Sequence, residues 1–360
     1  MQKNSLGYPV EFIANPFGET TELAKLVSGG RIFIVADVNV VQRVGGIGTK
    51  IGRYVQTHGL ELAGSPVVLS GGEKCKSDWI GGVGLVIEAA LEAKIGRADT
   101  VLAIGGGAVL DVAGYVAAQL RGGVRLVRMP TTPSAMVDAA YAAYAAVDFG
   151  GVKDALRVPS VPTAVVVDPA LAESVLDGVW NAGMSEAVRH AAVLDAALFK
   201  KLVKLAPDYF ARKPGTLDVL VREAFASRQK KGGSDFALWS AHRLEAMSEY
   251  RLPHGYAVVT GILIDTAYAV ARELMKPEDR EALTGLLSGC KTFDGLSHSR
   301  RHLEQTESLL KGLNANELAT GSAEIVLPSG LGKHVRETVD REMLRNVIRG
   351  LLQPQPSTAA

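Results

Sequence analysis

The sequence has few cysteines and almost no net charge. Its two cysteines, Cys75 and Cys290, lie far apart, so we expect no disulfide framework and a reducing, cytoplasmic setting. The net charge is only +1, and no basic stripe runs along the chain. Neither a nucleic acid nor an anionic membrane surface is therefore expected as a partner.

Long uninterrupted apolar runs are also missing. The most apolar stretch, YAVVTGILIDTAYAVA at 256–271, is interrupted by Asp265 and predicts a buried helix rather than a membrane span. The opening MQKNSLGYPVEFIANPF lacks the apolar core of a signal peptide, so none is expected. What is present, 47% apolar and 21% charged residues, is typical of a soluble globular protein.

At 360 residues the chain exceeds the usual size of one compact core, which favours two domains. In the first half, runs rich in valine and isoleucine alternate with helical patterns. Strands are predicted within 31–41, 64–74, 124–132 and 163–169, and 100–120 has the pattern of a strand, a glycine turn and a helix. Such alternation predicts a parallel sheet covered by helices on both faces.

From Met184 onward, apolar residues recur at helical spacing. Helices are predicted at 184–205, 216–230, 236–250, 254–274, 300–312 and about 340–352, with one extended piece, AEIVLPSG, at 323–330. We therefore predict an α/β nucleotide-binding domain at 1–180, an all-α or mainly helical metal and substrate domain at 181–353, and a disordered tail at 354–360. The cleft between the domains is the expected site.

Three glycines, Gly105 to Gly107, lie where a strand leads into a helix. Without side chains they allow backbone N–H groups to approach a pyrophosphate at the helix N-terminus. The pattern is not G-x-G-x-x-G, and a tight turn alone is an equally good interpretation. Other candidates for nucleotide binding follow the first two long strands: Asp37, Asn39, Glu73 and Lys76.

Together with these loops, several further segments carry a resemblance to a known family. The segments are DVN, GGEKCK, GGGAVLDVAGYVAAQLRGG, MPTTPSAMVD, GMSEAVRH and LPHGYAVVTGI, in this order along the chain. In them the sequence resembles the 3-dehydroquinate synthase-like sugar-phosphate cyclases. The pieces WSAHRLEAMSEYRLPHG and LLKGLN…IVLPSGLGK are most similar to a divergent subgroup from bacterial secondary-metabolite (Ebo-type) operons.

The resemblance implies a homodimeric carbon–oxygen lyase that uses NAD and a divalent metal, usually zinc, held by one glutamate and two histidines. In such enzymes NAD transiently oxidises a hydroxyl of a sugar phosphate, phosphate is eliminated, hydride returns, and an intramolecular aldol step closes the ring. The metal polarises the reacting oxygen. Cationic side chains neutralise the phosphate.

The resemblance also assigns roles to individual residues. The nucleotide would contact Gly105, Gly106, Gly107, Asp111, Thr131, Thr132 and Asp138. The metal would be held by Glu186 and His254, with His242, twelve residues before His254, as a further metal or catalytic imidazole. Phosphate-side cations would be Arg121, Lys153 and Lys333. His190 lies one helical turn after Glu186, where helix packing is the better interpretation.

The sequence departs from the family at several of these places. The expected third ligand, four residues before His242, is Leu238, and the glycine before it is Ala237. Tyr144 stands where a catalytic lysine is expected, within an alanine-rich run at 139–146 that favours a helix. Three milder changes are Asp154 and Asp235 for asparagines, and Arg189 for a lysine. Tyr144 and Arg189 remain candidate catalytic residues.

Three functions remain open on the sequence. The first is an active NAD- and metal-dependent cyclase or phosphate lyase, not 3-dehydroquinate synthase proper, that acts on a sugar phosphate or a related polyol. The second is a catalytically weakened relative that keeps the nucleotide pocket but lacks a complete metal site. The third is a metal-dependent polyol dehydrogenase, which GMSEAVRH fits less well.

Overall fold

The computed structural model describes residues 6–289 and 294–353 and divides into two compact units, Met1–Trp180 and Asn181–Ala360. Each unit is described by itself below. The predicted tail at 354–360 and Cys290 lie outside the described residues. Cys75 is buried as a free thiol.

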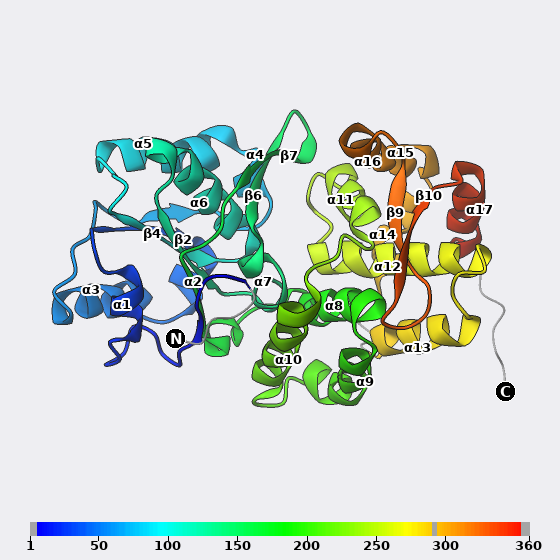
Figure 1. The fold of residues 1–360 in the computed structure, drawn as a ribbon, viewed down its shortest axis with the longest axis horizontal. Coiled ribbons are helices and arrows are strands. Elements are labelled where there is room, and N and C mark those ends of the chain that lie inside the picture. The colour runs from blue at the N-terminus through cyan, green and yellow to red at the C-terminus, as the bar shows by residue number, and fades with distance from the viewer. Residues whose placement is uncertain (1–5, 290–293, 354–360) are drawn as a thin grey trace. The chain divides into compact units, whose positions relative to one another are not determined.

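A six-stranded parallel sheet forms the centre of the first unit (Figure 1). Its strand order is β1 (Val10–Phe12), β8 (Ala164–Val167), β5 (Arg125–Pro130), β4 (Thr100–Gly105), β2 (Ile32–Asp37), β3 (Val67–Leu69). The helices are α1 (Glu22–Val27), α2 (Val38–Arg43), α3 (Ile47–Thr57), α4 (Lys74–Ser77), α5 (Leu85–Glu92), α6 (Gly107–Gln119) and α7 (Pro133–Val137). Short helical turns occupy Trp79–Gly84, Leu120–Gly122, Ala139–Tyr141 and Pro169–Ala172.

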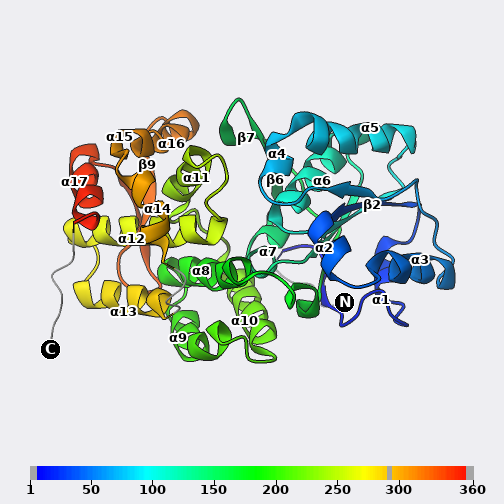
Figure 2. The ribbon, with the colours of Figure 1, turned by 180° about the vertical axis from the view of Figure 1, so that it is seen from behind.

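Successive side chains of a strand point to opposite faces of the sheet, so every second residue shows which helices cover a given face. Ile32, Ile34 and Ala36 on β2 belong to one apolar cluster with residues of α1 and α3. Helices α5 and α6 cover the opposite face, as both ribbon views show (Figures 1 and 2). The predicted parallel sheet with helices on both faces is thereby confirmed.

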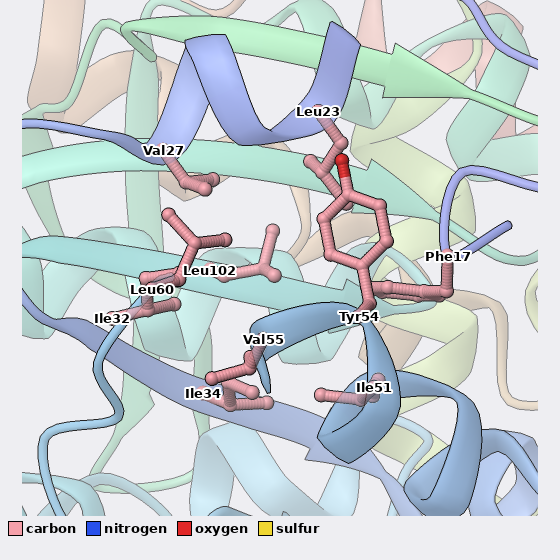
Figure 3. A pocket seen from close by; sticks show the side chains of 10 residues that line it. All are labelled: Phe17, Leu23, Val27, Ile32, Ile34, Ile51, Tyr54, Val55, Leu60 and Leu102. Carbon is pink, nitrogen blue, oxygen red and sulfur yellow. The ribbon is translucent and has the colours of Figure 1, made fainter. Parts of the chain in front are cut away.

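A small apolar pocket lies inside the α1–α3 side of this core (Figure 3). Its lining is Phe17, Leu23, Val27, Ile32, Ile34, Ile51, Tyr54, Val55, Leu60 and Leu102. The hydroxyl of Tyr54 is already used, because it donates to Thr20 O at 2.8 Å and accepts from Ala24 N at 2.8 Å. The pocket is a packing void of the core and offers no polar group to a ligand.

An antiparallel hairpin, β6 (Tyr144–Phe149) and β7 (Val152–Pro159), packs against α6. The sequence predicted a helix in the alanine-rich run, and this prediction was wrong. Arg128, fully buried on β5, donates to the carbonyls of Ala142 at 2.6 Å and Ser160 at 3.0 Å, and more weakly to that of Tyr144. Because the guanidinium takes these carbonyls, the segment does not need helical hydrogen bonds.

The second unit is mainly helical, as predicted, with one antiparallel hairpin. Its helices are α8 (Asp177–Leu194), α9 (Ala196–Phe210), α10 (Thr216–Lys231), α11 (Leu238–Met247), α12 (His254–Ala271), α13 (Pro277–Ser288), α14 (Gly295–Leu303), α15 (Thr306–Leu310), α16 (Leu313–Thr320) and α17 (Arg341–Leu351). The hairpin is β9 (Glu324–Pro328) and β10 (His334–Thr338), so the unit is not entirely α-helical. The helix predicted at 184–205 is interrupted at Asp195, whose carboxylate caps α9.

Helix α12 is the central element of the second unit, and α11, α13, α14, α17 and β9 all pack on it (Figure 1). Gly261 permits a close crossing with α11, since a Cβ there would lie 2.4 Å from Ala237 O. One turn later, the Asp265 carboxylate accepts from Ala237 N at 3.1 Å and Trp239 Nε1 at 2.8 Å. Within the described ranges, no helix combines the length and apolarity needed to cross a membrane.

Replacing Arg128 with methionine should destabilise the first unit. Methionine keeps much of the buried volume but leaves the carbonyls of Ala142 and Ser160 without their donor. We expect a loss of roughly 2–4 kcal/mol in the free energy of unfolding, measured by urea denaturation. The exposed Arg97→Met serves as the matched control. Equal stability of the two variants would contradict the anchoring role of Arg128.

Candidate functional site

The strand order reverses beside β2, because β3 lies on one side of it and β4 on the other. In open α/β sheets, ligands bind at the carboxyl ends of strands at such a switch point. Asp37 ends β2 and Gly105 ends β4. A Cβ on Gly105 would lie 2.7 Å from Val109 Cβ and 3.2 Å from Asp37 Cβ, and one on Gly71 would lie 2.5 Å from Asp37 Oδ1. Only glycine fits at these close approaches.

The start of α6 has the features of a pyrophosphate site. The helix begins at Gly107, and its N-cap residue, Gly106, provides no side-chain hydrogen bond. The first backbone N–H groups therefore remain available, and the helix dipole favours an anion there. Thr131 N donates to Gly105 O at 3.0 Å, and a Cβ on Gly106 would meet Thr132 Cγ2 at 3.2 Å. The predicted glycine turn and threonine pair thus adjoin, and these residues fit a dinucleotide.

Beside this turn lies a group of charged residues, which we call the loop cluster: Glu73, Lys76, Asp111, Asp148, Lys153 and Asp154. Lys76 on α4 is its centre, with a side chain only 3% exposed. Its ammonium contacts Glu73 Oε1 at 3.1 Å, Asp111 Oδ2 at 3.0 Å and Asp154 Oδ1. Burial alone would lower the pKa of Lys76, but Asp111, Glu73 and Asp154 together raise it well above its usual value. Lys76 is therefore a permanent cation.

The rest of the loop cluster extends this charge network. Lys153 pairs with Glu73, and Asp154 N donates to Asp148 Oδ1 at 2.8 Å. Oxygens of Glu73, Asp148 and Asp154 lie within 4.8 Å of one another, a spacing that could hold a metal ion. Lysine ammonium groups already contact two of these three carboxylates.

Tyr144, at the position of the expected lysine, begins β6 next to the loop cluster. The guanidinium of Arg157 lies 5.2 Å from the centre of its ring, within the range of a cation–π contact. Arg157 Nη2 is also 3.7 Å from Asp154 Oδ2. Burial raises the pKa of Tyr144, so the phenol is neutral at pH 7. The side chain at this position supplies no positive charge.

The second unit contains a separate buried network around Glu186 on α8. Arg189 Nε donates to Glu186 Oε2 at 2.8 Å, and His254 Nε2 lies 2.8 Å from Glu186 Oε1. The other ring nitrogen of His254, Nδ1, lies 3.1 Å from Glu245 Oε1. Arg189 is anchored further by the carbonyl of Ser234. The structure thus brings Glu186 and His254 together.

The charges in this network compensate one another. Burial would raise the pKa of Glu186, but Arg189 and His254 outweigh it and lower the pKa to about 2. Burial would lower the pKa of His254, but Glu245 and Glu186 raise it to about 10. Both oxygens of Glu186 and both nitrogens of His254 face an oppositely charged partner.

These residues do not complete the three-ligand metal centre that the resemblance implies. Glu245 contacts Nδ1 of His254, as a carboxylate commonly contacts the outer ring nitrogen of a metal-bound histidine. The carboxylate of Glu186, on the other side of the ring, could serve as a second metal ligand. However, no third histidine, cysteine or carboxylate joins Glu186 and His254 in a group of mutually close ligand atoms among the described residues. His242 is half-buried on α11, and Leu238 has no donor atom. A catalytic zinc normally has three protein ligands.

The remaining candidates lie in other places. Arg121 is exposed in the turn after α6, and Lys333 is exposed in the β9–β10 turn. Asp138 directly follows α7. His190 packs toward α10, where its Nε2 is 3.5 Å from Ser227 Oγ. Asp235 is exposed and pairs with Arg336 at 3.3 Å.

Sequence reasoning missed three residues of these networks. Glu245 could have been found, because it lies seven residues after Leu238 and three after His242 on one helical face. Asp148 and Arg157 could not be placed without the β6–β7 hairpin, which was not predicted.

Comparisons with known proteins cover both units. Residues 66–180 match the family described as 3-dehydroquinate synthase N-terminal, and 183–311 the family described as 3-dehydroquinate synthase C-terminal. A 3-dehydroquinate synthase from Gloeobacter violaceus is 28% identical over 342 residues, 91% of each chain. A 2-epi-valiolone synthase from Actinosynnema mirum is 30% identical over 298 residues, 76% of this chain and 75% of the relative.

A solved structure extends the likeness to the fold. ValA, a 2-epi-5-epi-valiolone synthase from Streptomyces hygroscopicus subsp. jinggangensis with NAD+ and Zn2+ bound, superposes with a TM-score of 0.82. The two chains are 22% identical, and 96% of each is covered. The predicted fold, an α/β unit followed by a helical unit, is confirmed.

Metal binding should be weak in the natural sequence and stronger when the third ligand is restored. Leu238 lies on the same face of α11 as Glu245, which contacts His254. We expect Leu238→His to tighten zinc binding by at least about a hundredfold, measured by competition with a chelator. Stoichiometric zinc that remains on the wild-type protein against the same chelator would contradict the incomplete centre.

The stability of the second unit should depend on the ionisation of Asp265. Burial raises the pKa of Asp265 to about 7, despite the hydrogen bonds from Trp239 and Ala237. An unfolded aspartate titrates near pH ~3.9. Between these values the folded state binds the proton more tightly, so stability falls as pH rises.

Asp265→Asn removes this titration. The wild-type free energy of unfolding minus that of the variant should therefore decrease with rising pH, by up to about 1.4 kcal/mol per pH unit between about pH 4 and 7. Urea denaturation across this range measures the difference. A difference that is constant with pH would contradict the raised pKa.

Proposed function

Because the chain belongs to the 3-dehydroquinate synthase-like sugar-phosphate cyclases, we propose that it is an NAD-dependent cyclase or lyase acting on a sugar phosphate or a related polyol. The observation that carries the NAD assignment is the convergence of Gly105, Asp37 and the uncapped start of α6 at the switch point of the sheet. We further propose a homodimer in the cytoplasm, as the family resemblance implies.

The chain's own residues supply binding and proton handling in this proposal. Bound NAD would accept hydride from a carbon that bears a hydroxyl. The N–H groups at the start of α6 would hold its pyrophosphate, and Asp37 would accept hydrogen bonds from ribose hydroxyls. In the second unit, Glu186 and Glu245 would keep His254 in its charged form, because one carboxylate accepts from Nε2 and the other from Nδ1.

The substrate differs from that of 3-dehydroquinate synthase in this proposal. Tyr144 is neutral where a lysine is expected, and Asp154 adds a negative charge where an asparagine is expected. Arg189, in place of a lysine, is buried against Glu186. These three changes alter the charge and the donors available to a phosphate.

A divalent metal, with zinc favoured by the resemblance, would be held by Glu186 and His254, with His242 as a further ligand. Bound there, it would polarise a substrate oxygen. Since the described residues form only part of the expected ligand set, no step of the chemistry is assigned to a metal.

Two other functions have specific support. Leu238 and the internally paired Glu186 favour a weakened relative that binds NAD without turnover. A polyol dehydrogenase would use the same glycine turn. The three functions differ in the fate of the hydride, so kinetics of NADH absorbance with a panel of sugar phosphates and polyols separates them.

A cyclase releases phosphate or water without net NADH, because hydride returns to the product. Net accumulation of NADH would instead show that the protein is a polyol dehydrogenase. Absence of product and of any NADH transient across the panel, in protein that binds NAD, would replace it with the non-catalytic relative.

NAD should stabilise the wild-type protein in a thermal-shift measurement, since a ligand that binds the native state raises its melting temperature. Gly105→Ala should abolish the shift, because the new Cβ would lie 2.7 Å from Val109 Cβ and displace the turn. Gly45→Ala is the matched control, since a Cβ there meets nothing within 4 Å. An undiminished thermal shift in Gly105→Ala would show that NAD does not bind at this turn.

A further inference from the structure

The outer strand of the β6–β7 hairpin has an unpaired edge. Among the described residues, β7 (Val152–Pro159) pairs with β6 and with no other strand (Figure 1). Along such an edge, the N–H and C=O groups of every second residue point away from the sheet. Another strand can bond to these groups, so an exposed edge is a surface for association between chains.

The register of the hairpin shows which residues of β7 point outward. The amide of Ser160, directly after the strand, donates to Ala143 O at 2.9 Å, so the backbone of Ser160 faces β6. Hydrogen-bonded residues alternate along an antiparallel pair, and the register is regular from here to Leu156. Leu156 therefore also bonds to β6, and its neighbours Ala155 and Arg157 present their N–H and C=O groups outward.

Exposed apolar side chains lie along the same edge. Leu156 is 36% exposed, Val152 at the start of β7 is 54% exposed, and Val161, just after the strand, is 59% exposed. The two valines lie four residues before Leu156 and five residues after it. An arrangement that is nearly symmetric about one residue fits a two-fold axis, because such an axis places one end of the edge against the other end in a second copy.

Three antiparallel registers between two copies would use the outward groups, with the two-fold axis at residue 155, 156 or 157. With the axis at Arg157, the two Arg157 side chains would face each other, and Ala155 would meet Pro159, which has no N–H. With the axis at Ala155, Arg157 would have to pair beyond Asp154, whose φ of +53° interrupts the extended backbone. With the axis at Leu156, Ala155 and Arg157 pair with each other twice, and neither obstacle arises.

We propose that two copies of this chain join edge to edge through β7, with the two-fold axis at Leu156, so that the two hairpins form one four-stranded antiparallel sheet. The inference rests on the homodimer of the proposed function and assigns the surface that forms it. Ala155 of each copy exchanges hydrogen bonds with Arg157 of the other, and the two Leu156 side chains meet at the axis. Val152 of one copy lies toward Val161 of the other.

A disulfide across the axis tests this arrangement. The two Leu156 residues form a non-hydrogen-bonded pair, in which Cα atoms lie about 4.5 Å apart, a separation that a disulfide spans. Full-length Leu156→Cys, treated with diamide as the oxidant that takes up the two thiol hydrogens, should give a covalent dimer on a non-reducing gel. Leu85→Cys on α5 is the matched control, because Leu85 is 38% exposed in the same unit. The wild type, treated in the same way, gives the background from the native cysteines.

Leu156→Asp should separate the two copies, because it places two carboxylates opposite each other at the axis. We expect the dissociation constant of the dimer, measured by sedimentation velocity, to rise by at least about tenfold. Leu85→Asp should leave it unchanged.

Two results would overturn the inference while leaving the homodimer intact: a dimer that Leu156→Asp does not weaken, or a Leu156→Cys variant that cross-links no more than Leu85→Cys. A wild type that is monomeric throughout would refute both the inference and the homodimer of the proposed function, and the edge of β7 would then meet a different partner.

Discussion

The ammonium of Lys76 is the constraint on which the first unit's site depends. A buried cation is tolerated only when its donors are matched by acceptors, and three carboxylates from three different segments match them here. These contacts hold the loop after β3, the second turn of α6 and strand β7 together. The β6–β7 hairpin is thereby held against α6, and Arg128 bonds the carbonyls of Ala142, before β6, and Ser160, after β7.

The second unit follows the same electrostatic logic. Glu186 lies between Arg189 and His254, and His254 lies between Glu186 and Glu245. Positive and negative groups therefore alternate along the row Arg189, Glu186, His254 and Glu245. Three groups that the family resemblance would assign to metal or phosphate, Lys153, Glu186 and His254, are thus matched by partners from this chain. The departures at Tyr144, Asp154 and Arg189 are therefore parts of two coherent networks rather than isolated losses.

Some features were predictable because they depend on local sequence. The glycines 105–107 lie between a strand and a helix, and Asp37 ends a strand, so their meeting at one sheet edge follows from parallel pairing. Glu186 and His254 were predicted as neighbours from the resemblance. The β6–β7 hairpin was not predictable from its alanines, because the buried guanidinium of Arg128 competes for the carbonyls that a helix would use.

By itself, the sequence determined the two-part α/β and helical organisation, the glycine turn and the absence of a histidine at 238, since each depends on residue identity or short-range periodicity. Only the tertiary structure decided which charges remain available to a ligand. The sequence predicts that Lys76 and Lys153 lie in exposed loops, yet the side chains of both are buried against carboxylates. Their pairing arises from contacts between segments far apart in the chain, and no local pattern encodes such contacts.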